Sequence, residues 1–269
     1  MSWNLIRKTV SDRWRSIAIY AGGLFAYVLL TVGLYPTVQK MTGQLKELMQ
    51  KFSKDILRFF GTATFDLGSF NNYVVLRLLG LIWIVIVAAF VIAFARQMVA
   101  GELADGTLEL LLAQPIERWK VLTSEGLVLL VGSLSIVLAT VLGIFIFAPA
   151  FGVSVAFSGY LAFIPLGLAL MLAIGGYSVL FSVLFIDPRR AAMAAAGLTL
   201  AFYMLHFAGS YWKIVDKIDW FGIFHYYDPM KVLDSGAVPV KSVLLLLAFA
   251  VVGFGAAIWV FQRRDITTA

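Results

Sequence analysis

Six blocks of apolar residues, each close to the length of a membrane-crossing helix, constrain this chain more than any other feature. They lie at about 16–35, 73–95, 121–148, 159–186, 191–212 and 240–261. The hydrocarbon layer of a bilayer is about 30 Å thick, and a helix needs roughly 20 apolar residues to cross it. The blocks therefore predict an all-α, polytopic membrane protein with six transmembrane helices, in which the membrane domain occupies nearly the whole chain.

Composition supports this fold class and excludes several others. Hydrophobic residues make up 61% of the 269 residues and charged residues 13%, whereas soluble domains are roughly 45–50% apolar and 25% charged. The absence of cysteine excludes disulfides and thiolate metal sites, and a count of two histidines disfavours a histidine metal site. Phosphate-loop and hydrolase motifs are also missing. We expect no catalytic residues, no metal and no bound cofactor on this chain.

Basic residues predict the orientation of the spans, because they gather in cytoplasmic loops. If the N-terminus is inside, short basic clusters at the span ends fall on the cytoplasmic side: Arg7 with Lys8, Arg13 with Arg15, Arg118 with Lys120, Arg189 with Arg190, and Arg263 with Arg264. We therefore expect a protein of the inner (cytoplasmic) membrane with both termini in the cytoplasm. The positions of the charges are more informative here than the net charge of +6, and we expect no nucleic-acid partner.

Two segments beside the first span have amphipathic patterns. Residues 1–15 repeat apolar side chains at helical spacing and predict a short interfacial helix, although a basic, partly disordered tail would also fit. Residues 37–60 carry one apolar stripe and many charges, which predicts an external amphipathic helix. This helix would either cover hydrophobic surface as a lid or bind the substrate.

The external segment at 213–236 is rich in aromatic residues and ends in a turn signal. The residues concerned are Trp220, Phe224, Tyr226 and Tyr227, followed by Asp228 and Pro229. Proline breaks a helix, and aromatic side chains settle at the membrane–water interface. The segment is therefore either an external gate or an aromatic anchor at the membrane surface.

The loop between spans 2 and 3, at 96–120, contains a defined apolar element. Gly106 lets the backbone turn, Thr107 to Gln114 can form two helical turns, and Pro115 ends them. Leu108, Leu111 and Leu112 then need a partner surface outside the bilayer. That surface is either the chain's own span ends or a cleft in another protein.

The motif in this loop resembles the signature of permease subunits of ABC-2 type transporters. It comprises Gly101-Glu102, the run from Asp105 to Leu112, Gln114-Pro115-Ile116 and Arg118. The resemblance implies that residues 1–269 form a single ABC-2 type transmembrane domain and that the loop helix is a coupling helix seated in a separate ATPase subunit. The residues that it assigns to this coupling are Glu102, Gly106, Thr107, Leu108, Glu109, Leu111, Leu112, Pro115 and Arg118.

The same resemblance implies a working unit of two permease copies and two ATPase subunits, with ATP and Mg²⁺ on the ATPase. This chain would then be a transport subunit and not an enzyme. The expected cargo is an exported amphipathic, lipid-like, peptide or antibiotic molecule. A stand-alone ion-coupled carrier or a non-transporting assembly subunit is the alternative, but the middles of the six spans lack Asp, Glu, Lys and Arg, which disfavours proton-driven transport.

Overall fold

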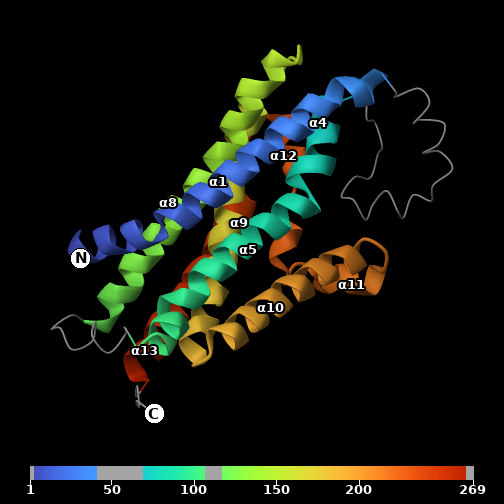
Figure 1. The fold of residues 1–269 in the computed structure, drawn as a ribbon. Coiled ribbons are helices and arrows are strands. Elements are labelled where there is room, and N and C mark those ends of the chain that lie inside the picture. Colours follow the sequence, from blue (N-terminus) through green and yellow to red (C-terminus); the bar gives the residue numbers. More distant parts are fainter. Residues whose placement is uncertain (1–2, 41–68, 107–116, 265–269) are drawn as a thin grey trace.

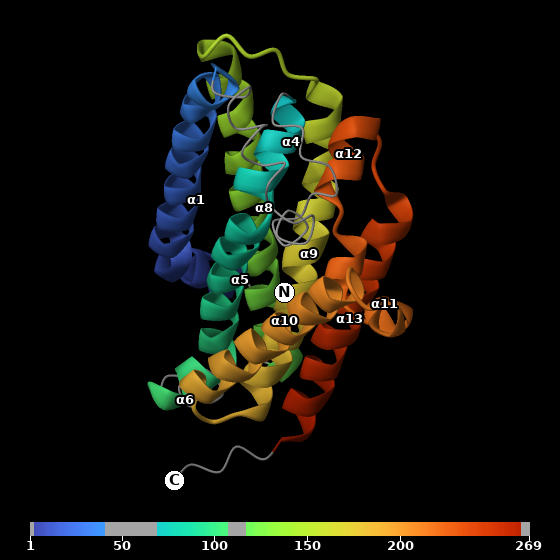
Figure 2. The same ribbon diagram turned by 90° about the vertical axis from the view of Figure 1, so that its right-hand side faces the viewer.

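A computed structural model describes residues 3–40, 69–106 and 117–264, which form a bundle of long helices (Figures 1 and 2). Six helical segments are long and apolar enough to cross a membrane: Thr9–Lys40, Phe70–Ala104, Arg118–Ala150, Phe157–Leu184, Pro188–Gly209 and Val240–Arg263. The described residues contain no strand. The predicted all-α fold with six spans is confirmed. We call the end of the bundle that carries both chain termini the inner end, and the opposite end the outer end.

The elements follow one another in a simple order. The long helices are α1 (Trp3–Lys40), α8 (Arg118–Ala150), α9 (Phe157–Leu184), α10 (Pro188–Gly209) and α13 (Val240–Arg263). Between α10 and α13 lie α11 (Lys213–Asp219), the 3-10 helix η3 (Ile223–Tyr226) and α12 (Pro229–Ser235). These short elements fill the predicted external segment at 213–236.

The first helix runs without interruption from Trp3 to Lys40, so residues 3–15 and the first span share one helix. Its inner part packs on the bundle: Thr9 Oγ1 donates a hydrogen bond to Glu125 Oε1 of α8 at 2.9 Å, and the Arg13 guanidinium lies 5.1 Å from the centre of the Phe94 ring. Val10 and Trp14 remain exposed. Of the predicted helix at 37–60, residues 41–60 lie outside the described residues.

The second span is not one regular helix. It consists of α4 (Phe70–Val74), the π-helical turn η1 (Val75–Leu79), a break at Gly80, α5 (Leu81–Arg96), a second π-helical turn η2 (Gln97–Gly101) and α6 (Glu102–Ala104). π-helical turns widen a helix by one residue and leave backbone groups without their usual partners. Side chains from other helices must therefore complete this span.

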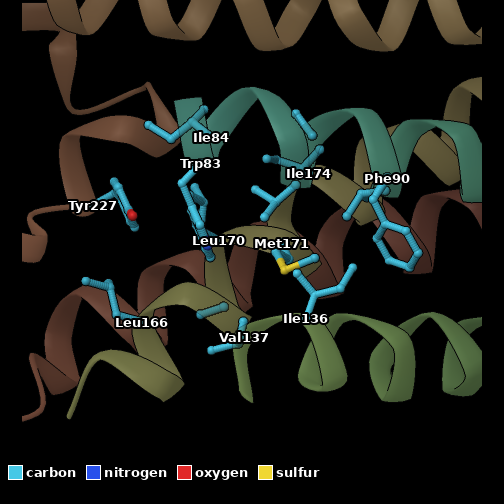
Figure 3. Close-up of a cluster of buried hydrophobic side chains, with 14 of the residues drawn as sticks. Trp83, Ile84, Phe90, Ile136, Val137, Leu166, Leu170, Met171, Ile174 and Tyr227 are labelled. Atoms are coloured by element: carbon cyan, nitrogen blue, oxygen red, sulfur yellow. The ribbon is translucent and has the colours of Figure 1, made fainter. Parts of the chain in front are cut away.

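Helix α9 lies at the centre of the bundle, with α5, α8, α10, α12 and α13 against it (Figure 2). Figure 3 shows its core contacts, in which Leu170, Met171 and Ile174 of α9 meet side chains of α5 and α8. The crossing of α9 and α13 depends on two glycines, since a Cβ added to Gly253 would lie 2.5 Å from the carbonyl carbon of Gly176. Helices α1, α10 and α13 form the periphery.

Candidate functional site

The loop that carries the predicted coupling helix begins at a sharp turn after α6. Gly106 has φ +71°, a left-handed conformation that glycine adopts without steric cost. The Gln97 side chain donates a hydrogen bond to Asp105 Oδ2 at 2.9 Å and holds the residues before this turn. Thr107, Leu108, Glu109, Leu111, Leu112 and Pro115 lie outside the described residues, so the structure places only Glu102, Gly106 and Arg118 of the predicted coupling set.

A serine from the central helix supports the π-helical turn that leads into this loop. Ser182 Oγ of α9 accepts hydrogen bonds from the backbone amides of Val99 and Ala100, both at 3.2 Å, and donates one to the carbonyl oxygen of Arg96, also at 3.2 Å. One buried hydroxyl thus satisfies three backbone groups of the irregular turn. The inner end of span 2 is consequently fixed to α9.

Arg118, at the other side of the loop, joins two further helix ends. Its Nη1 donates to the carbonyl oxygens of Phe261 at 3.3 Å and Arg264 at 2.7 Å, at the end of α13. Arg264 in turn donates to the carbonyl oxygen of Val183 near the end of α9. The unpaired carbonyls at a helix C-terminus favour cations, so Arg118 has a structural role within this chain.

Glu117 precedes this arginine on the exposed surface. The carboxylate pairs with Lys120, with 3.3 Å between Nζ and Oε2, and accepts a hydrogen bond from Trp119 Nε1 at 2.5 Å. These hydrogen bonds, from Lys120 and then from Trp119, stabilise the charged form and lower the pKa of Glu117. The start of α8 therefore carries an exposed, charged cluster of hydrogen-bonded side chains.

Two tyrosines complete the backbone at the outer break of span 2. Tyr27 of α1 donates to the carbonyl oxygen of Arg77 at 2.5 Å, and Tyr227 donates to that of Leu79 at 2.8 Å. The Tyr227 ring is stacked on Trp83, with 5.9 Å between centroids and 2° between planes (Figure 3). Burial raises the pKa of Tyr227 well above its ordinary value, which keeps the hydroxyl a hydrogen-bond donor.

The predicted external gate residues divide into a buried group and an exposed group. Phe224 and Tyr227 are buried, and Phe224 meets Tyr203 edge-on at 5.6 Å. Trp220 is 52% exposed and stacks on Phe221 at 3.8 Å, while the half-buried Tyr226 donates to the carbonyl oxygen of Trp220 at 2.8 Å. The gate residues thus do not form one surface.

Asp228 and Pro229 start a helix where the sequence predicted a turn. Asp228 Oδ1 accepts from the Lys231 amide at 3.1 Å, which makes Asp228 the N-cap of α12, and Pro229 occupies the first helical position. Proline is well suited there because its missing N–H has no partner in the first turn of a helix.

Comparison with known proteins identifies the family. The family model described as "ABC-2 family transporter protein" matches residues 3–266. The chain belongs to the ABC-2 transporter family. No curated protein matches it. The chain is therefore an integral membrane permease of an ABC transporter and not itself catalytic, and membership of the family implies association with an ABC ATPase.

One cluster in this ABC-2 permease was not predicted from the sequence. Asp219, at the end of α11, accepts hydrogen bonds at Oδ2 from Nδ1 of His206 at 3.0 Å and from Nδ1 of His225 at 2.8 Å. The three residues come from α10, α11 and η3, and no spacing motif joins positions 206, 219 and 225. Their convergence follows from the fold of the external segment.

Proposed function

We propose that this permease exports an amphipathic, lipid-like, peptide or antibiotic molecule and that a separate ATPase, seated on residues 102–118, drives it. The observation that carries the proposal is the course of span 2. Helical structure runs from the outer break at Gly80 through α5 and η2 to α6, where the loop begins. Movement of the loop is thereby linked to the outer part of the bundle through one continuous element.

The contacts of this span suggest how motion passes from the ATPase to the cargo path. Ser182 joins the inner end of the span to α9, so a displaced loop moves the central helix as well. At the outer end, the hydroxyls of Tyr27 and Tyr227 bind carbonyls that the break leaves free. Exchange of these hydrogen bonds lets α4 and η1 change direction without unfolding the span, as breaks in membrane helices allow when other groups satisfy the backbone.

The experiment on the ATPase contact uses the double variant Leu111→Asp/Leu112→Asp. Two buried carboxylates would oppose an apolar interface, so we expect the variant to insert into the membrane but to lose the ATPase. The measurement is the amount of ATPase that co-purifies with the tagged permease from its own cells, identified by mass spectrometry. Ile186→Asp, at an exposed apolar position before α10, is the matched control. Full retention of the ATPase by the double variant would contradict the assignment.

The same preparations separate the exporter from a stand-alone carrier or an assembly subunit. Export from ATP-loaded membrane vesicles is expected to stop in the double variant and to continue in Ile186→Asp. If transport persists without a co-purifying ATPase, the ion-coupled carrier is favoured. If the wild-type permease forms a complex but transports nothing, the assembly subunit is favoured.

For the external segment, we propose that Trp220, Phe224, Tyr226 and Tyr227 close the outer end of the cargo path. The support is the contrast between the buried Phe224 and the exposed Trp220, which stacks on the exposed Phe221. Phe224→Ala and Tyr226→Ala are expected to change ATP-dependent export and basal ATPase rate per folded complex. Unchanged export in both, with only a lower melting temperature, would leave the anchor interpretation.

A further inference from the structure

The carboxylate of Asp219 is buried and only partly satisfied. The residue is 4% exposed, and its Oδ2 accepts from two histidines, whereas its Oδ1 has no hydrogen-bond partner within residues 3–40, 69–106 and 117–264. Among the described residues, the ion pairs of Asp219 involve these two histidines and no lysine or arginine. A buried charge with a free acceptor is costly, and a bound cation would compensate for it.

We propose that His206, Asp219 and His225 form a binding site for one divalent transition-metal ion, with Zn²⁺ as the probe. One ligand atom from each residue lies within 4.8 Å of the others, and Asp219 Oδ2 is 3.0 Å and 2.8 Å from the two Nδ1 atoms. Zn²⁺ binds imidazole nitrogen and carboxylate oxygen at about 2.0–2.2 Å, which places tetrahedral ligands about 3.3 Å apart. Each imidazole nitrogen would therefore move a few tenths of an ångström away from Asp219 Oδ2, and the two histidine ligand atoms, which lie within 4.8 Å of each other, would approach by up to about 1.5 Å.

The three ligand side chains and their exposed fractions fit a metal site with one coordination position left open. The His206 and His225 side chains are 40% and 41% exposed, whereas that of Asp219 is 6% exposed. The two imidazoles are thus open at the surface of the bundle, while the carboxylate would anchor the ion from inside. Three protein ligands leave the fourth tetrahedral position for water.

The backbone around Asp219 lets the three elements approach. A Cβ added to Gly209 of α10 would lie 3.3 Å from Asp219 Cβ, and the Gly222 amide donates to the Asp219 carbonyl oxygen at 2.8 Å. Because Gly209 has no side chain, α11 can pack closely enough on α10 for Asp219 to reach His206. The turn at Gly222 then brings His225 back to Asp219. A metal ion would hold the end of α10, α11 and η3 together.

A purely hydrogen-bonded cluster is the competing interpretation, and it differs in the position of protons. To donate to Asp219 Oδ2, both imidazoles must carry a proton on Nδ1. To bind a metal through Nδ1, each neutral ring must instead carry its proton on Nε2. Metal binding therefore replaces two hydrogen bonds by two nitrogen–metal bonds, and acid weakens it because protons compete for the imidazole nitrogens.

The test is metal binding by the detergent-purified permease, prepared with an affinity tag that contains no histidine. After removal of metals with a chelator, the protein is dialysed against Zn²⁺, and bound metal is measured by elemental analysis. The chain has two histidines and no cysteine, so background binding by strong ligands is small. The double variant His206→Gln/His225→Gln removes the site. The matched control is Asp216→Asn, which changes an exposed carboxylate on α11, the helix that carries Asp219.

We expect one Zn²⁺ per chain in the wild type and in Asp216→Asn, a higher melting temperature with Zn²⁺, and at least about tenfold weaker binding in the double variant. Visible absorption bands of bound Co²⁺ provide a second readout in the wild type alone, whether or not the variants fold well. Zn²⁺ binding equal in wild type and double variant, or no Co²⁺ bands in the wild type, would overturn the proposal. Neither result depends on the ATPase or on cargo export.

Discussion

Hydroxyl groups from three different parts of the chain complete the backbone of span 2. Tyr27, Ser182 and Tyr227 bind carbonyl or amide groups at its two irregular turns. A buried backbone group without a partner costs about 1–3 kcal/mol, and in a membrane no water replaces the lost hydrogen bond. Ser182 and Tyr227, whose hydrogen bonds are buried, are therefore expected to stabilise the irregular span.

Removal of one such hydroxyl is expected to lower stability with little change in shape. Tyr227→Phe keeps the stack on Trp83 but leaves the Leu79 carbonyl unpaired, so we expect a loss of about 1–3 kcal/mol. The measurement is the melting temperature in detergent. Tyr226→Phe is the control, because its hydroxyl binds an exposed backbone oxygen, and a smaller decrease is expected there. Equal decreases in the two variants would argue against a special role for the break.

At the scale of elements, sequence reasoning located all six spans because run length and hydropathy identify a membrane helix. It missed the breaks within span 2, because a single glycine such as Gly80 or Gly101 is tolerated inside a helix and the partners that stabilise Val75–Leu79 and Gln97–Gly101 come from distant segments. It also did not anticipate one continuous helix over 3–40, where no glycine or proline separates the interfacial pattern from the span.

The crossing of α9 and α13 yields a prediction about glycine. Gly253→Ala would place a Cβ 2.5 Å from the carbonyl carbon of Gly176 and force the helices apart, which costs about 1–3 kcal/mol. Gly255→Ala on the same helix is the control, because nothing lies within 4 Å of its added Cβ. We expect a lower melting temperature only for Gly253→Ala. A stable Gly253→Ala protein would show that the crossing can relax.

At the scale of the whole molecule, the spans with the smallest share of buried residues identify the surface that is left for lipid or for other proteins. In the most apolar windows of α10 and α13 alike, 17% of the residues are buried. On α10 the exposed residues include small ones and form a stripe at helical spacing: Met193, Ala196, Gly197, Leu200 and Met204. Small residues allow membrane helices to approach closely. Lipid alone would also satisfy this face, but if two permeases enclose the transport path, as the family resemblance implies, this face is a suitable contact between them.

We therefore expect two copies of the chain to meet along α10. The natural sequence has no cysteine, so Gly197→Cys introduces a single thiol, and oxidation should link two copies in membranes. Val252→Cys, exposed on α13, is the control and should remain monomeric under the same oxidation. The mass of the purified complex gives an independent copy number, and one permease per assembly would contradict the dimer.

The candidate sites were predictable to different degrees. The loop motif from Gly101 to Arg118 identified the family because it is contiguous in sequence. The internal contacts of Arg118 were not predictable, since they depend on where α9 and α13 end. His206, Asp219 and His225 were missed for the same reason: hydrophobic periodicity predicts where spans lie, but it does not show which residues of separate helices meet.

The stacked pair of Trp83 and Tyr227 offers an optical reporter of the outer break. Trp83 is fully buried, and its indole Nε1 donates to Thr140 Oγ1 at 3.2 Å. Trp14, Trp119, Trp212, Trp220 and Trp259, the other tryptophans whose side chains the structure describes, are all exposed. In a variant that keeps Trp83 as its single tryptophan, the wavelength of the tryptophan fluorescence would therefore shift when water or cargo reaches this position. Transport could then be followed without an added dye.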